Sequence, residues 1–198
     1  MELVNATMYH YKDKRRKSEK WVEGNEFIIS KDYKSYECEQ IVPIDKNLSL
    51  IDKKIEYYTL LKNDNKPLKL ADRVNIREKM LELYRSTYCQ NEISRMNCMF
   101  FCDEQSVVYW DHMFPSYYDL YEVVLNGEAF KTSSKLLPIL NCNRSYTYEE
   151  FFELCKAYWN PNLMDENLCC FSEYLFQGSV YVKEKVDKEV VRSRYIFK

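Results

Sequence analysis

Three polar side chains stand within or at the entry of apolar segments, where burial costs free energy unless a partner compensates for it. They are His10, inside the segment 8–11; Arg95, just before an apolar run; and Glu173, at the start of another. Titratable groups in such surroundings gather at functional sites, so the three are candidates for ligand binding or catalysis. Each also has a structural interpretation: a hydrogen-bonded histidine, an arginine paired with an acid, and a glutamate at an exposed strand edge.

All three candidates fall on or beside predicted strands. Runs of β-branched and aromatic residues predict strands, and glycines mark the breaks between them. Strands are expected at 7–11, 26–29, 96–102, 117–125, 172–177, 179–186 and 189–197. The Asn126–Gly127 pair is a hairpin signal, so residues 128–131 are expected to fold back on the preceding strand.

Helices are predicted between these strands. Apolar spacing of three and four predicts helices over 51–63 and 70–88. The core stripe of the second is expected to be Val74, Arg77, Leu81, Tyr84 and Tyr88, with Ile76, Met80 and Leu83 beside it. Asp103 is predicted to cap a helix that Pro115 ends, and Thr147 with Glu150 forms a capping box for a helix ending near Trp159.

The order of these elements indicates the fold class. It does not alternate strictly between strand and helix, which argues against a doubly wound parallel fold, so an α+β arrangement of mixed or antiparallel sheets flanked by helices fits better. A chain of 198 residues, 46% of them hydrophobic, can bury one sizeable core and is short for two. We therefore expect a single domain over residues 1–198.

Charge and glycine content exclude several classes. With 29 basic and 31 acidic residues the net charge is -2, which argues against non-specific nucleic-acid binding, and the basic run 12–17 is interpreted as a solvated loop. Three glycines are too few for a glycine-rich phosphate loop. No apolar stretch reaches the roughly 20 residues that cross a bilayer, and the N-terminus lacks a signal-peptide pattern. A cytoplasmic protein without a membrane partner is expected.

The cysteines are predicted to be free buried thiols, given that expectation of a reducing compartment. Zinc would need clustered ligands, and the spacing supplies only fragments of such a set. Cys98 and Cys102 are expected on one face of a strand, while the two histidines, His10 and His112, lie far away in sequence. No metal is therefore predicted. The eight cysteines are Cys38, Cys89, Cys98, Cys102, Cys142, Cys155, Cys169 and Cys170.

Three motifs follow one another along nearly the whole chain. The first is Tyr9–His10 with the segment 21–26. The second is 94–101, a Ser–Arg pair leading into a strand of small residues and Phe, then Tyr109–Trp110. The third is Tyr158–Trp159 with 173–175 and 178–182, and 121–123 adds a weaker match. In this order and rough spacing they resemble a family of uncharacterised bacterial proteins that carry the ADP-ribosyltransferase-like fold, a split sandwich.

This resemblance implies an NAD-dependent ADP-ribosyltransferase. Cleavage of the nicotinamide–ribose bond of NAD passes through an oxocarbenium-like cation. Glu173 would stabilise that charge and hydrogen-bond the 2′-hydroxyl. His10 would bind a ribose hydroxyl, and Arg95, assisted by Ser94, would bind the pyrophosphate. Either Tyr109 or Tyr121 would stack on the nicotinamide.

The chain departs from the family pattern in places that do not remove a proposed catalytic group. Glu92–Ile93 replaces a proline common before the Ser–Arg pair, and Asn160–Pro161 replaces Lys–Gly after the third Tyr–Trp. Phe171 stands two residues before Glu173, where transferases that modify arginine carry an acid or amide, so arginine is not the expected acceptor. A nucleic-acid base, another side chain, a small molecule and water remain open.

Two other function classes compete. One is a non-enzymatic interaction protein or pseudoenzyme of the same fold, from a mobile element or a defence system; the active counterpart would be a toxin held by an inhibitory partner protein. The other is a nuclease or hydrolase using Glu149–Glu150, although the capping box already explains Glu150. A cleft lined by His10, Arg95 and Glu173 together would favour the NAD hypothesis, and a Glu173 pointing away into solvent would exclude it.

Overall fold

Five strands join into one antiparallel sheet in the order β1–β4–β5–β2, with β3 also paired to β5. They are β1 (Glu2–Asp13), β2 (Glu26–Ile29), β3 (Met99–Phe101), β4 (Tyr118–Ser133) and β5 (Ser172–Val186). The computed structural model describes the chain except residues 17, 36–37, 39, 63–67, 115, 139, 141–145, 166 and 197–198. Lys17, Pro115, Cys142 and Phe197, which the sequence analysis used, therefore lie outside the described residues.

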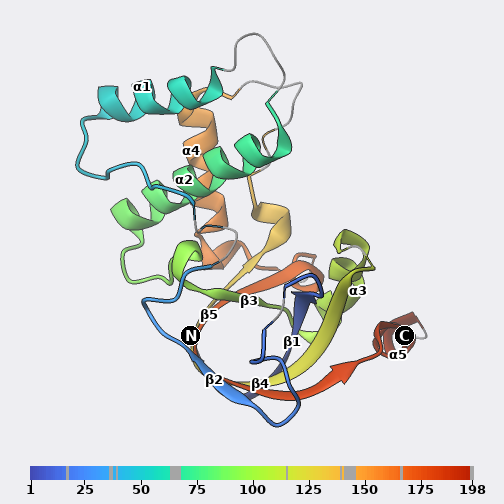
Figure 1. Cartoon of the computed structure of the whole chain (residues 1–198). Helices are drawn as coiled ribbons and strands as arrows, with labels where there is room; N and C mark the ends of the chain where they lie inside the picture. The colour runs from blue at the N-terminus through green and yellow to red at the C-terminus, as the bar shows by residue number, and fades with distance from the viewer. Residues whose placement is uncertain are drawn as a thin grey trace.

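The sheet is strongly curved, and a single bridge links β1 to the residue that follows β3 (Figure 1). Tyr9 of β1 and Cys102, just after β3, form an isolated antiparallel bridge with N–H···O distances of 2.9 and 3.0 Å. Because β3 already pairs with β5 and β5 with β4, this bridge connects β3 back to β1. It also brings His10 and the segment after Arg95 side by side, although 85 positions (95 − 10) separate them in the sequence.

The Asn126–Gly127 pair is not a hairpin, so that prediction was wrong. β4 runs straight through it, and β5 runs equally straight through Gly178, where a break between two strands was expected. Gly127 and Gly178 lie opposite each other in the sheet with positive φ angles of 154° and 145°. A Cβ on Gly178 would lie 2.4 Å from the Asn126 carbonyl oxygen and 2.8 Å from the Phe176 ring, so the glycines permit a close approach of two backbones instead of a turn.

The segment 96–102 is only partly the strand that was expected. A turn of 3₁₀-helix, η2 (Arg95–Asn97), precedes the short β3. The Ser94 hydroxyl accepts a hydrogen bond from Met96 N at 3.1 Å and so starts this turn. The consequence is that Arg95 is carried into the interior and does not sit at a strand edge.

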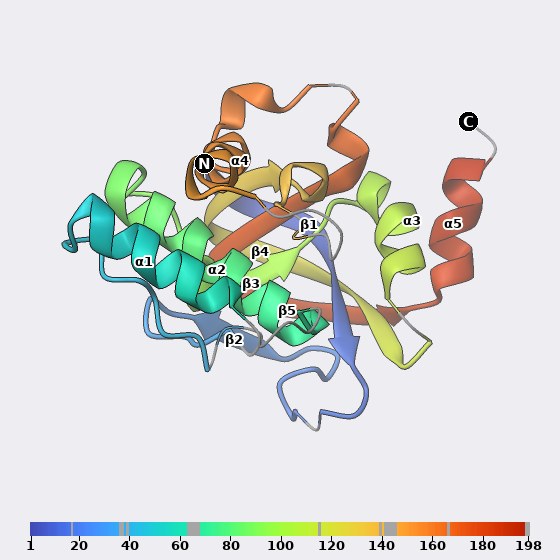
Figure 2. The same cartoon turned by 90° about the horizontal axis from the view of Figure 1, so that it is seen from above.

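Helices lie on two sides of the sheet (Figures 1 and 2). One group holds α1 (Leu50–Leu61), α2 (Leu70–Tyr88) and α4 (Tyr148–Tyr158), and the other pairs α3 (Glu104–Met113) with α5 (Lys188–Ile196). The predicted caps are confirmed: Asp103 accepts from Ser106 N at 3.0 Å, and Thr147 and Glu150 form their capping box. Both helices therefore begin where the sequence placed them.

The last element corrects a prediction, because residues 188–196 form a helix and not a strand. The Asp187 carboxylate accepts a hydrogen bond from Glu189 N at 2.9 Å, which is an N-terminal cap. Lys188 pairs with Asp111 of α3 at 3.2 Å, and Val191 is fully buried. Packing against α3 stabilises the helix despite its β-branched residues.

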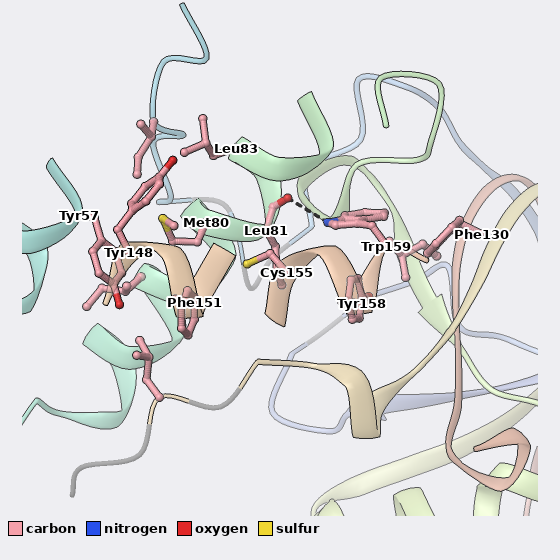
Figure 3. Packing of buried hydrophobic residues seen from close by; sticks show 14 of the residues in the cluster. Tyr57, Met80, Leu81, Leu83, Phe130, Tyr148, Phe151, Cys155, Tyr158 and Trp159 are labelled. Carbon is pink, nitrogen blue, oxygen red and sulfur yellow. Dashed lines mark hydrogen bonds between the residues drawn. The ribbon is translucent and has the colours of Figure 1, made fainter. Parts of the chain in front are cut away.

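The largest core lies between α1, α2, α4 and the sheet (Figure 3). Trp159 closes α4 and donates from Nε1 to the Leu81 carbonyl oxygen at 3.0 Å. The expected α2 stripe is only partly correct: Leu81 is buried, but Tyr88 is 65% exposed. The buried face of α2 is Ile76, Glu78, Met80, Leu81, Glu82 and Leu83.

These observations confirm the α+β class with an antiparallel sheet flanked by helices, joined here into one sheet where several were expected. None of the helices in the described ranges has the length and apolar character needed to cross a membrane.

Candidate functional site

A cavity of about 350 Å³ opens between β1, the loop that follows it, β3, α3 and the start of β5. This volume lies at the lower end of the roughly 300–1,000 Å³ typical of small-molecule pockets. His10, Arg95 and Glu173 all line it. The curl of the sheet thus brings together three polar residues that the sequence singled out separately.

His10 is held in one orientation. Its Nδ1 lies 2.8 Å from the Phe100 carbonyl oxygen, and its ring stacks on Trp21 with centroids 4.4 Å apart and planes 10° from parallel. A carbonyl can only accept, so Nδ1 carries the proton and Nε2 presents a lone pair. Burial, opposed by the Phe100 bond and aided by Lys12, lowers the pKa of His10 from 6.5 to about 4. The ring is therefore neutral at pH 7 and accepts hydrogen bonds through Nε2.

Arg95 lies at the floor of the cavity, 4% exposed, between two carboxylates. Its Nε donates to Glu78 Oε2 at 2.7 Å and its Nη2 to Glu78 Oε1 at 3.2 Å. Its Nη1 donates to Glu173 Oε1 at 2.5 Å and also to the Tyr158 hydroxyl oxygen. A guanidinium has five N–H donors, so these four hydrogen bonds leave at most one for a ligand.

Ion pairing keeps Glu78 and Arg95 charged. Burial acts to raise the pKa of Glu78, but the charges of Arg95 and Arg77 outweigh it and hold that pKa below its ordinary value. Burial acts to lower the pKa of Arg95, and Glu173 with Glu78 overcomes it and raises the pKa well above its ordinary value. Two arginines thus face two carboxylates, and the cluster is electrically balanced.

Glu173 has one carboxylate oxygen bound and one available. Oε1 accepts from Arg95 and, at 2.6 Å, from the Tyr158 hydroxyl. Oε2 makes no hydrogen bond with any described residue, and Glu173 lines the cavity. Burial and the nearby Glu173 raise the pKa of Tyr158 well above its ordinary value, so its hydroxyl stays a donor. A carboxylate fixed on one side can therefore act on a ligand with the other.

Aromatic walls surround these polar groups. The wall beside Arg95 is Phe100, whose ring centroid lies 4.7 Å from the guanidinium carbon. Trp110, on α3, is fixed by a 3.0 Å hydrogen bond from Nε1 to the Ser172 carbonyl oxygen. The other aromatic residues around the cavity are Tyr9, Tyr11, Trp21, Tyr33, Phe101, Phe114 and Tyr118. A planar ring has several faces to stack on.

Ser94, Tyr109 and Tyr121 are not among the described residues that line the cavity. The Ser94 hydroxyl donates to Glu82 Oε2 at 2.9 Å on the helix side. The Tyr109 ring packs edge-on against Phe171 at 4.6 Å. The Tyr121 ring packs against Trp21, with the two ring centroids 5.2 Å apart. In this structure the ring that flanks His10 is Trp21, which belongs to the first motif but was not expected to take part.

Glu78 and Tyr158 are the other residues that sequence reasoning missed. Glu78 lies about one helical turn before Leu81, on the same face of α2. A prediction that chose the buried face correctly would have placed this glutamate inside the protein, where it needs a cation as partner. Tyr158 was noticed only as half of a Tyr–Trp pair.

No described group of three His, Cys, Asp or Glu side chains is arranged to hold a metal ion. Glu149 pairs with Lys54 and Glu150 caps α4, so both lie in surface roles.

The arrangement combines a fixed carboxylate, a neutral imidazole acceptor and aromatic walls. A carboxylate of this kind can stabilise positive charge that develops on a bound sugar ring. Comparison with family models matches residues 8–188, most of the chain, to the family described as Protein of unknown function (DUF2441). No curated protein matches the sequence.

Proposed function

Since the chain belongs to the DUF2441 family, whose description assigns no activity, we propose its function from the cavity: NAD-dependent transfer of ADP-ribose, on an ADP-ribosyltransferase-like fold. The single observation that carries the proposal is that His10, Arg95 and Glu173 line one cavity. The three motifs that suggest this activity contribute one of these residues each. A structural use of all three would not require them to share a cavity.

In the proposed reaction the nicotinamide–ribose half of NAD enters the cavity. Glu173 Oε2 faces the ribose and stabilises the oxocarbenium-like charge as the bond from C1′ to the nicotinamide nitrogen breaks. The electron pair of that bond leaves with nicotinamide, and an acceptor nucleophile then bonds to C1′ and loses its proton. His10 Nε2 accepts a hydrogen bond from a ribose hydroxyl. A volume of about 350 Å³ suits this half of NAD better than the whole molecule.

Arg95 takes a different part in this proposal from the one its motif suggests. Four of its hydrogen bonds go to Glu78, Glu173 and Tyr158, so it is a positioning residue that fixes the orientation of the Glu173 carboxylate. The acceptor stays open among a nucleic-acid base, another side chain, a small molecule and water. An inhibitory partner protein would have to cover the mouth of the cavity.

The test is release of nicotinamide from NAD by the purified protein, with and without cell extract, for the wild type and Glu173→Gln. The variant keeps the shape of the side chain and loses the charge, so a loss of about 10²–10³-fold is expected. Glu184→Gln, on the exposed end of β5, is the matched control and should leave the rate unchanged. Melting curves of both variants show whether the fold persists.

A second candidate function is favoured by one specific observation. The same carboxylate oxygen of Glu173 serves both Arg95 and Tyr158, as in a purely structural ion-pair cluster. A non-enzymatic binding protein with this cavity would bind a ligand without converting it. Binding of NAD by the folded wild type without any nicotinamide release, with and without extract, would support that function and contradict the transferase.

A further inference from the structure

We infer that the cavity takes a phosphate-bearing ring compound with the ring inward and the phosphate outward, held at the mouth by Lys12, Arg16 and Lys20. The inference shares the cavity of the proposed function but does not require any reaction. It moves the anion site from the buried Arg95, where the sequence placed it, to the end of β1 and the loop that follows it.

The buried cation of the cavity, Arg95, is already neutralised. Arg95 faces Glu78 and Glu173, both within hydrogen-bond distance. A phosphate placed against it would meet the negative charge of Glu173 as well. An anion therefore gains little net attraction at the floor of the cavity.

Three other cationic side chains line the same cavity. Lys12, Arg16 and Lys20 line it together with the Ser18 hydroxyl. Arg16, Ser18 and Lys20 are exposed, whereas Arg95 and Glu173 are buried, so the cations form the mouth and the carboxylate the floor. This rim is basic in a chain whose net charge is -2.

Lys12 and Lys20 have hydrogen-bonding capacity to spare. Lys12 Nζ donates to the Arg16 carbonyl oxygen at 2.7 Å and to the Asp13 carbonyl oxygen at 3.3 Å. An ammonium has three donors, so the backbone holds Lys12 in place and leaves one donor. Neither Lys12 nor Lys20 forms an ion pair with a carboxylate in the described part of the chain. Arg16 Nε lies 3.8 Å from Asp13 Oδ2.

The carboxylate of the rim is engaged by a different residue. Asp13 accepts three hydrogen bonds from the Arg15 guanidinium, the shortest at 2.6 Å. These bonds lower the pKa of Asp13 to about 2, so its charge is balanced by Arg15 at every pH of interest. The positive charges of Lys12 and Lys20 therefore remain on the lining of the cavity, next to aromatic walls that suit a planar ring.

Calorimetric titration with matched pairs tests the inference: nicotinamide mononucleotide against nicotinamide riboside, and AMP against adenosine. We expect the phosphate to raise the affinity of at least one pair about ten-fold or more in the wild type. Lys12→Met and Lys20→Met should each remove most of that gain and leave the affinity of the riboside or adenosine unchanged. Lys156→Met, which removes an exposed cation on α4, is the control.

Lys12→Met also removes two hydrogen bonds to backbone carbonyls. If that variant fails to fold, Lys20→Met decides the test. The inference is overturned if, in both pairs, the compound with the phosphate binds no more tightly than the compound without it. It is also overturned if all rim variants lose affinity equally for compounds with and without a phosphate. Nicotinamide release is measured separately. If the rim residues raise the affinity for phosphate-bearing ligands but no nicotinamide is released, only the proposed transferase activity is refuted. If nicotinamide is released and the KM for NAD is unchanged in the rim variants, only the role of the rim is refuted.

Discussion

At the scale of single residues, the position of the Glu173 carboxylate depends on two residues that do not themselves carry the proposed reaction, Arg95 and Glu78. Arg95 holds one oxygen of that carboxylate, and Glu78, on α2, holds Arg95 by two hydrogen bonds. Breaking a buried ion pair by removing one partner is costly because the other charge stays buried. Substitutions in the hydrogen-bonded row of Glu78, Arg95 and Glu173 should therefore lower stability more than substitutions in any surface ion pair.

Glu78→Gln tests this row. It removes one of two carboxylates that neutralise Arg95, and about 3–5 kcal/mol of unfolding free energy should be lost. The measurement is urea unfolding followed by circular dichroism. Glu153→Gln, which breaks an exposed pair with Lys156, is the control and should change stability by about 0.5 kcal/mol or less. Equal small effects of both variants would show that the buried cluster contributes no special stability.

At the scale of elements, two glycines lie opposite each other at an irregular level of the sheet. Gly127 and Gly178 face each other where β4 and β5 cross most closely, and Asn126 there accepts a hydrogen bond from Asn5 N at 2.7 Å. Asn5 has a positive φ of 48° at a register shift in β1. A second register shift lies between β4 and β5 at Glu122 and Val123, whereas the positive φ angles of Asn5, Gly127 and Gly178 fall at one level of three adjacent strands. That is where we expect the curl that joins β1 to β3 to be generated.

Gly178→Ala should consequently destabilise the fold by about 1–3 kcal/mol, because it adds a left-handed strain and a contact with backbone atoms. Gly24→Ala has a positive φ of 84° but open space around the new methyl group, so it carries strain alone and should cost less. Denaturant midpoints of the two variants give the comparison. A Gly178→Ala protein as stable as Gly24→Ala would mean that the close approach of the strands is not tight.

At the scale of the whole molecule, β4 and β5 connect three cores. Phe130 and Leu175 belong to the core under α2 and α4, while Ala129 and Phe176 belong to the core on the other face. Leu120 of β4 reaches the third core, beside α3 and α5. Because neighbouring residues of one strand serve different cores, no core can lose its structure alone.

We therefore expect one cooperative unfolding transition for the whole chain. Each of the three tryptophans reports on a different core: Trp159 on the first, Trp21 on the second and Trp110 on the third. Variants that keep one tryptophan and replace the others by Phe should unfold at the same midpoint by fluorescence and by far-ultraviolet circular dichroism within each variant. A fluorescence midpoint separated from the circular dichroism midpoint in any of them would indicate an independent subdomain.

The sequence by itself determined the local features whose signals are local. The helix caps at Asp103 and Thr147 follow from side chains within three residues of the helix start, and α2 has the bounds that its spacing predicts. The three candidate residues were found because a charge in an apolar segment is visible in sequence. The Asp187 cap was equally local, and missing it turned a helix into a predicted strand.

Only the tertiary structure decided what those residues meet. The sequence predicts a turn at Asn126–Gly127, but in the structure Gly178 lies opposite Gly127 in the sheet. The sequence also predicts that Arg95 binds phosphate, but in the structure Glu78 and Glu173 both pair with it. The partners lie 51 (178 − 127), 17 (95 − 78) and 78 (173 − 95) positions apart. Hydrogen bonds and ion pairs act over a few ångströms, so their energy depends on distances that the order of residues does not contain.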